Sequence, residues 1–471
     1  MLPVPPLSTT LSGSLHRMNI RITLFALIIL PLPLIAAEQS DKPSLEQYLK
    51  ESVATREDVE KSIKTSHRWK FDGELGVVDG EYVGEVGGLP GGIDGSFNVG
   101  TFQADGARKS FIYSDQKPRI NTYGDSFTHG DQVNDGETWQ EYLAAHLREP
   151  IGNFGVGGYG VYQAYRRMLR EENTDHAAKY LILTICCDDS TRTLFRSWFP
   201  ITRTLEHRVF AGAKPNIEID LGSGRFVEKE SLLPTESSLF NLTNPTWMVE
   251  NLQDDLALQL QLYGGGWWVN EQRIRDVDHK KITRLATLLH FDMDWRPETT
   301  TDLVPSKYAA YGMPPITRMQ QQCLELLNKY AQAATIYILD KARAFADQKG
   351  KKLMVILVLN TDGNMLSKTG VRDNQDVIDH LQKEHFYYFD IDQALVDDYR
   401  KANTTLTYSE YVKKYLVNGQ GHLNALGNHF FAYAIKDKVI QWLDPKPRTY
   451  EKQRDVQLEK EYFFNARPPS N

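Results

Sequence analysis

The sequence predicts an α/β protein built on a parallel sheet that helices cover on both faces. From Pro118 onward, short runs rich in β-branched and aromatic residues alternate with amphipathic stretches of helical length. Before that point, closely spaced glycines predict short strands joined by tight turns. Between residues 191 and 318 the alternation stops, and five of the eight tryptophans fall there. We therefore expect a small β-rich N-terminal region and a Trp-rich insertion beside the sheet.

The elements of this sheet follow one another along the chain as strand, helix, strand. Strands are predicted over residues 119–123, 151–156, 179–187, 351–359 and 386–391. Helices are predicted over residues 137–147, 161–172, 321–348, 374–385 and 425–443, and a polar helical segment over 44–66. This alternation favours a parallel sheet, in which ligand sites gather at the carboxyl ends of the strands.

Composition excludes some classes of function. The chain has 471 residues, with 41% hydrophobic and 24% charged residues, which is typical of a globular protein large enough for two or three domains. Its 54 basic and 61 acidic residues give a net charge of -7, so no basic surface for nucleic acid is expected.

The N-terminus has the layout of a secretory signal. Arg17 and Arg21 precede the apolar run 22–37, which contains two prolines and ends in small residues. The run is shorter than the about 20 apolar residues of a membrane anchor, so we expect a cleaved signal, no stable anchor, and a periplasmic or secreted protein. The three cysteines, Cys186, Cys187 and Cys323, do not suggest a disulfide framework and are expected as buried free thiols.

These features divide the chain into six segments. They are a signal peptide (1–37), an N-terminal helix and β-rich region (38–117), the first part of the α/β domain (118–190), the insertion (191–318), the second part of the α/β domain (319–445) and a C-terminal tail (446–471).

Three short motifs follow predicted strands or precede the last helix. They read YGDSFT at residues 123–128, NFGVGGYG at 153–160 and GHLNALGNHFFA from Gly421. Together, and in this order, they resemble the motifs of the SGNH/GDSL hydrolase family of esterases and lipases. The resemblance implies a flavodoxin-like three-layer sandwich, with Ser126 as nucleophile, His422 as base and the amide of Gly158 in the oxyanion hole. No cofactor or metal is implied.

The chain departs from that family at two positions. Asp188 stands where the family has an asparagine that donates to the oxyanion, and Gly419 stands where it has the aspartate that orients the histidine. A charged Asp188 cannot replace the asparagine, so it either is protonated and donates or pairs with Arg192, four residues on. We favour the pairing with Arg192.

Acyl transfer needs a hydroxyl, a base and donors for the oxyanion. Ser126, His422 and the backbone amides of Ser126 and Gly158 can supply them. In place of an aspartate, we expect a backbone carbonyl to orient His422, with Asp390 or Asp392 as carboxylate alternatives. The remaining candidate residues are assigned to substrate binding: Asp125, Gly157, Tyr159 and Asp189.

Other histidines and a metal site were weighed against this assignment. His129 is expected in a surface turn and His429 in the core or just behind the site. Asp125, Asp188, Asp189 and His422 could converge on a hard cation, but no metal-ligand spacing supports that chemistry, and we expect none.

The sequence thus predicts an exported serine esterase acting on a small-molecule or glycan ester, with an acetyl ester favoured. The tryptophans of the insertion could stack on sugar rings, but we favour them as the insertion's own core. The alternatives are an O-acetyltransferase that uses the same residues and a catalytically inactive carbohydrate-binding module.

Overall fold

The fold is built on a five-stranded sheet whose strands are all parallel. The computed structural model describes residues 42–65, 68–86, 97–186, 188–202, 209–266, 269, 271–296, 303–304, 314–359, 361–419 and 421–447. The strands are β5 (Ile120–Tyr123), β6 (Gly152–Asn153), β7 (Tyr180–Cys186), β12 (Lys352–Val358) and β13 (Tyr388–Asp390). Their order is β13-β12-β7-β5-β6, so each of the five predicted strands joins the predicted parallel sheet.

The strand order creates a switch point in the middle of the sheet. From β5 the chain moves to one edge to form β6, and it then crosses back to form β7, β12 and β13 on the other side. Loops that leave β5 and β7 at their carboxyl ends therefore diverge, which is where open α/β sheets bind ligands.

Helices cover both faces of the sheet. The five predicted ones are α5 (Trp139–Leu147), α6 (Val161–Glu171), α12 (Arg318–Gln348), α14 (Gln375–Lys383) and α17 (Ala425–Trp442). Helices α13 (Gly363–Thr369), α15 (Ile391–Ala402) and α16 (Tyr408–Val412) were not predicted. Side chains at the N-termini stabilise two of these helices. Thr317 and Gln320 form a capping box at α12, and Asn424 caps α17 by accepting from Gly427 N.

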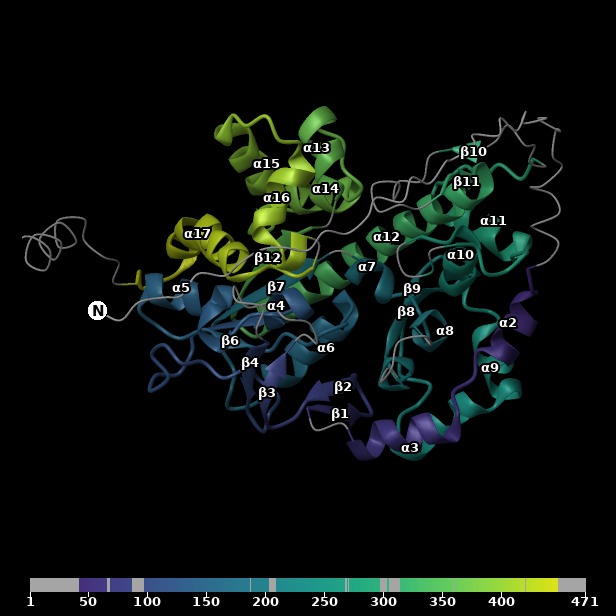
Figure 1. The fold of residues 1–471 in the computed structure, drawn as a ribbon, viewed down its shortest axis with the longest axis horizontal. Helices are drawn as coiled ribbons and strands as arrows, with labels where there is room; N and C mark the ends of the chain where they lie inside the picture. The colour runs from purple at the N-terminus through teal and green to yellow at the C-terminus, as the bar shows by residue number, and fades with distance from the viewer. Residues whose placement is uncertain are drawn as a thin grey trace, which may run out of the picture.

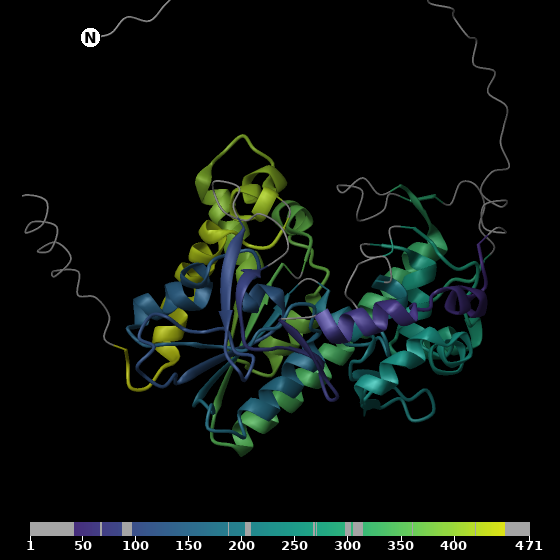
Figure 2. The same ribbon diagram turned by 60° about the horizontal axis from the view of Figure 1, so that its bottom comes forward.

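Residues of β7 alternate between the two faces, as the period of two requires. Leu181, Leu183 and Ile185 pack in the core that contains α6, α12 and α14, whereas Ile182 and Cys186 pack in the core that contains α5, α15 and α17. Figure 2 shows the yellow α17 and the green α12 on opposite sides of the sheet. Cys186 and Cys323 are buried, as expected, and Cys187 lies outside the described residues.

The N-terminal region forms helices α2 (Leu45–Glu51) and α3 (Arg56–Thr65) and two antiparallel hairpins. Strands β1 (Trp69–Asp72) and β2 (Gly76–Asp79) make the first hairpin, and β3 (Tyr82–Val86) and β4 (Asn98–Phe102) make the second. Arg108 bridges the second hairpin to β6, because it pairs with both Phe102 and Asn153. The second hairpin thus attaches to the β6 edge of the sheet, close to the loop after β5.

Residues between β7 and α12 pack against the N-terminal half of α12, at the right of Figure 1. They form α7 (Asp189–Arg192), α8 (Phe199–Thr202), β8 (Asn216–Ile219), β9 (Phe226–Lys229), α9 (Pro245–Leu252), α10 (Leu256–Gly264), α11 (His279–Leu288), β10 (Leu303–Val304), β11 (Ile316–Thr317) and two 3-10 segments, Val209–Gly212 and Glu236–Thr243. Their core is continuous with the α6 and α12 face of the sheet.

The tryptophans of this segment belong to that core. Trp198 is buried, and Trp247 and Trp295 are half-buried against it, while Trp267 and Trp268 lie outside the described residues. These three rings therefore serve packing, as the sequence favoured.

Residues 1–37, for which the sequence predicts a signal peptide, and residues 448–471 of the tail also lie outside the described residues. No helix in the described ranges is long and apolar enough to cross a membrane.

Candidate active site

Ser126 is the first residue of a short helix, α4 (Ser126–His129), that begins just beyond the carboxyl end of β5. The side chain of Asp125 caps this helix by accepting a hydrogen bond from Phe127 N at 2.9 Å. Gly124 allows the tight turn between strand and helix, because a β-carbon there would lie 2.1 Å from Thr128 Oγ1. The serine therefore sits at the switch point of the sheet.

His422 meets this serine from a loop that precedes α17. Its Nε2 lies 2.8 Å from Ser126 Oγ, although the two residues are 296 positions apart in the sequence. The contact is within hydrogen-bond distance, as predicted. A base this close to a serine hydroxyl can accept its proton directly.

Gln132 holds the other nitrogen of the His422 ring. Its Oε1 lies 2.7 Å from His422 Nδ1 and also accepts from the backbone N–H of His422 at 3.3 Å. Because that backbone group can only donate, the oxygen of the Gln132 amide must face the histidine, and Nδ1 must carry the hydrogen. His422 Nε2 is then free to accept from Ser126 Oγ.

The expected orienters of His422 are therefore wrong. The partner is a side-chain amide rather than a backbone carbonyl, and neither carboxylate alternative takes this place. Asp390 caps α15 and its Oδ2 lies 2.6 Å from Arg372 Nη2, while Asp392 is buried within α15. The sequence does not predict this role for Gln132, because the residue belongs to none of the three motifs and lies 290 positions from His422.

The loop after β6 brings glycine backbone close to the serine. Gly157 and Gly158 are half-buried, and a β-carbon at Gly157 would lie 3.9 Å from Ser126 Cβ. Gly158 has a φ of +83°, which favours glycine. Within the described part of the chain, the amide N–H groups of Ser126 and Gly158 donate no hydrogen bond, so both are available to an oxyanion.

Asp188 is turned toward Arg192, as the sequence favoured. Arg192 Nη2 and Nε donate to the two Asp188 oxygens at 2.8 and 3.1 Å, in a bidentate pair. This pair fixes the carboxylate just after the end of β7, against the Arg192 guanidinium.

Arg192 also binds the carboxylates of Asp189 and Asp125. Its Nη1 lies 3.2 Å from Asp189 Oδ1 and 3.9 Å from Asp125 Oδ2. Burial raises the pKa of Asp189 well above its usual range, and the neighbouring Asp125 carboxylate raises it further. Burial likewise raises the pKa of Asp125.

Three of the expected substrate-binding side chains are therefore structural. Asp125 and Asp189 are each only 1% exposed, and Asp189 Oδ2 accepts from Cys186 N at 2.9 Å. Tyr159 is also buried, and its hydroxyl donates to Val77 O at 2.6 Å. Of the four residues assigned to substrate binding, only Gly157 remains open beside the serine.

The carboxylates considered as metal ligands surround a guanidinium instead. Asp125, Asp188 and Asp189 all lie within 4 Å of Arg192. Among the residues that the structure describes, no group of three or more His, Cys, Asp or Glu side chains is arranged to hold a metal ion.

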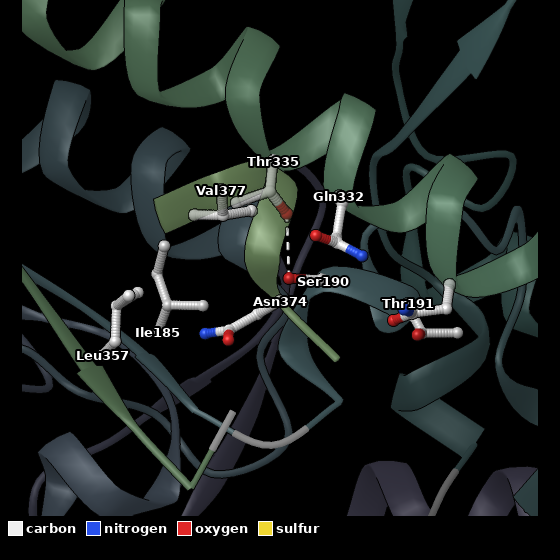
Figure 3. Close-up of a pocket in the computed structure, with 9 residues that line it drawn as sticks. Ile185, Ser190, Thr191, Gln332, Thr335, Leu357, Asn374 and Val377 are labelled. Atoms are coloured by element: carbon white, nitrogen blue, oxygen red, sulfur yellow. Dashed lines mark hydrogen bonds between the residues drawn. The ribbon is translucent and has the colours of Figure 1, made fainter. Parts of the chain in front are cut away.

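Trp198 connects the insertion to the site. A β-carbon at Gly158 would lie 3.7 Å from the Trp198 ring, and the Arg192 guanidinium lies 4.9 Å from the centre of that ring. Behind α7, Ser190 Oγ accepts from Thr335 Oγ1 of α12 at 2.9 Å (Figure 3). The small pocket drawn there, which also contains Gln332 and Asn374, is bordered by α7 and α12. Helix α7 is thus fixed between the site and the long helix.

The N-terminal hairpins build the loop that carries Gln132. Arg108 donates to the carbonyls of His129, Gly130 and Val133, and Asn98 Nδ2 donates to Gln132 O at 2.6 Å. Gln132 has a φ of +68°, an uncommon conformation for a residue other than glycine. The loop conformation therefore depends on residues more than 20 positions upstream in the sequence.

The expectations for the two other histidines are wrong. His129 is fully buried rather than in a surface turn, because its ring stacks on Phe102 of β4 with centroids 4.9 Å apart. His429 is exposed on α17 rather than in the core, with its ring edge-on to Tyr142 at 5.2 Å.

Comparisons with known proteins add no family to this description. No protein-family model and no curated protein matches the chain. One solved crystal structure aligns with 68% of this chain and 94% of its own, at 11% identity and a TM-score of 0.29. A likeness of this size carries no conclusion about fold or activity, so the function has to be inferred from the site itself.

Proposed function

We propose that this protein is a serine esterase of the SGNH type that hydrolyses an acyl ester through Ser126, His422 and Gln132. The observation that carries the proposal is the chain of two contacts, 2.8 Å from Ser126 Oγ to His422 Nε2 and 2.7 Å from His422 Nδ1 to Gln132 Oε1. A nucleophile, a base and a group that orients the base are thereby aligned, which is the arrangement of serine hydrolases.

The architecture supports the same assignment. Numbered along the chain, the sheet has the order 2-1-3-4-5 of flavodoxin-like folds, and the serine follows its first strand. The glycine loop after the second strand lies beside the serine, and the histidine precedes the last helix. These are the positions that the three motifs implied.

In the proposed reaction, Ser126 Oγ attacks the ester carbonyl while its proton moves to His422 Nε2. The N–H groups of Ser126 and Gly158 stabilise the oxyanion, and His422 returns the proton to the leaving alkoxide, which departs as the alcohol. Water then attacks the acyl-enzyme and gives a proton to His422, which passes this proton to Ser126 Oγ as the acid is released.

Two further parts of the proposal rest on the sequence alone. Export to the periplasm or beyond depends on segment 1–37, which lies outside the described residues. The preference for an acetyl ester of a small molecule or glycan depends on the resemblance to the SGNH family.

Labelling with a fluorophosphonate probe tests the nucleophile. Wild-type protein should be labelled, and Ser126→Ala should not be. Ser190→Ala is the matched control, because Ser190 lies nearby but its hydroxyl is bound to Thr335. Labelling that persists in Ser126→Ala would contradict the assignment of the nucleophile. A folded wild type that is neither labelled nor active on p-nitrophenyl acetate would contradict the proposal and favour a binding module.

A further inference from the structure

Asp131 lies between Ser126 and a buried cluster that consists of Arg68, Asp79 and His129. Its Oδ1 is 3.4 Å from Arg68 Nη2 and 2.9 Å from His129 Nδ1. Arg68 Nη2 also lies 2.7 Å from His129 Nε2. Because a guanidinium can only donate, Nε2 must accept, and Nδ1 carries its hydrogen on the side of Asp131. We count the contact between His129 Nδ1 and Asp131 Oδ1 as electrostatic.

The other oxygen of Asp131 faces the active site. A β-carbon at Gly157 would lie 3.2 Å from Asp131 Oδ2 and 3.9 Å from Ser126 Cβ. The distance between Asp131 Oδ2 and Ser126 Cβ is therefore at most 7.1 Å, the sum of the two. A substrate group that extends from Ser126 Oγ over Gly157 would pass this oxygen.

Asp131 is ionised at neutral pH and fixed in place. Burial alone would raise its pKa, but contacts with His129 and Arg68 and the nearby His422 hold the pKa well below its usual range. Its side chain is 13% exposed, whereas that of Asp79, the other carboxylate on Arg68, is fully buried. Only one of the two carboxylates on Arg68 can therefore meet a substrate.

We propose that Asp131 is a specificity-determining residue that selects esters bearing a hydrogen-bond donor next to the ester group. Its Oδ2 accepts from a hydroxyl or an ammonium on the alcohol or acyl side of the substrate and repels a carboxylate in the same place. This inference rests on the proposed esterase activity and names the substrate class of that site.

The chemistry of the cluster supports recognition over a merely structural role. A carboxylate that only paired with Arg68 would need no free oxygen beside the serine, and Asp79 already accepts from Arg68 Nε at 2.7 Å. With one oxygen held by two neighbours, the remaining oxygen is preorganised, which lowers the cost of ordering it on binding.

Pairs of esters that differ only by methylation of one hydroxyl test the inference. Ethylene glycol monoacetate is compared with its methyl ether, and methyl glycolate with methyl methoxyacetate, and kcat/KM is measured for each ester. Aminoethyl acetate, assayed below pH 7 to limit acyl migration, separates an ammonium from a hydroxyl as the donor. Wild type should prefer the donor-bearing member of at least one pair by about tenfold, because a hydrogen bond to an ionised carboxylate is stronger than one between neutral groups.

Asp131→Asn should reduce this preference to about threefold or less, since the neutral amide is a weaker acceptor. Asp79→Asn is the matched control, because it also alters a partner of Arg68 but lies away from the serine, and it should keep the wild-type preference. Gly157→Ala gives a second test that leaves Asp131 in place, because its β-carbon would crowd Oδ2 and should also lower the preference.

The outcomes separate this inference from the proposed function. A wild type that hydrolyses the esters without any donor preference overturns the role of Asp131 and leaves the esterase proposal intact. The same holds if Asp131→Asn and Gly157→Ala both keep the preference, or if Asp79→Asn loses it equally. A folded wild type that hydrolyses none of the esters overturns both.

Discussion

The side-chain oxygen of Gln132 lies 2.7 Å from His422 Nδ1, in the place that a carboxylate takes in many serine hydrolases. A neutral amide fixes the tautomer and the direction of the ring as a carboxylate does, but it adds no charge to stabilise the imidazolium. At this site the group that orients His422 therefore carries no charge. The neighbouring residue on the same loop, Asp131, is an ionised carboxylate.

Removing the acceptor at position 132 should lower activity without unfolding the protein. Gln132→Met keeps the volume but accepts only weakly from Nδ1, so kcat should fall by about 10- to 100-fold with little change in KM, at or below the lower end of what a positioned base contributes. Gln132→Glu is the control, since its carboxylate can still accept, and it should retain most of the activity. Near-wild-type kcat in Gln132→Met would show that another group orients His422.

The sequence allowed the sheet and the contact between Ser126 and His422 to be predicted because both depend on local patterns. Apolar runs of strand length alternate with helical segments, and Ser126 and His422 stand in short motifs at the ends of such elements. Gln132 and Asp131 depend instead on contacts between distant segments. Arg68, Asn98 and Arg108 shape their loop from the N-terminal hairpins, and no pattern in a single sequence reveals that packing.

The same distinction explains the mistaken side chains. His129 stands in a polar, glycine-rich stretch that is typical of a surface turn, yet β4 covers it. Tyr159 lies within the second motif and Asp189 follows β7, and both were assigned to the substrate, but each points into the core, where a backbone group or Arg192 satisfies it. Adjacency in sequence located the site without giving the direction of each side chain.

Because Asp188 pairs with Arg192, we expect substitutions of these two residues to have opposite effects on kcat. A carboxylate about 3 Å from an oxyanion would repel it by about 5 kcal/mol at an effective dielectric constant near 20. Asp188→Asn should therefore retain or raise kcat at neutral pH, because its amide removes that charge and can donate. Arg192→Ala should lower kcat by at least about tenfold, because it frees Asp188 to approach the oxyanion.

The double variant Arg192→Ala/Asp188→Asn controls for this effect, since it should recover part of the lost kcat. Arg192→Ala should also lower the free energy of unfolding by about 3–5 kcal/mol, the usual cost of leaving buried charges without their partner. Urea denaturation measures that loss separately from kcat. A folded Asp188→Asn without turnover would instead give the carboxylate a direct catalytic role.

Lys214 should make stability depend on pH. It is 2% exposed, and its ammonium donates to the backbone carbonyls of Arg192 and Phe195 just after the site. Burial lowers its pKa from the usual 10.5 to about 7; the nearby Arg192 also lowers it, while Asp255 acts in the opposite direction. The unfolded chain therefore binds more protons than the folded chain between these two values, so the contribution of Lys214 to stability rises with pH from about 7 to 10.5.

Comparison with Lys214→Met isolates this contribution, because all other titrating groups are shared by the two proteins. The free energy of unfolding of wild type minus that of Lys214→Met, from urea denaturation at pH 7, 8, 9 and 10, should increase with pH by at most about 1.4 kcal/mol per unit. Lys50→Met, at an exposed lysine on α2, should show a constant difference from wild type over the same range. A constant difference for Lys214→Met as well would mean that the buried ammonium keeps its charge throughout, stabilised by the two carbonyls that it binds.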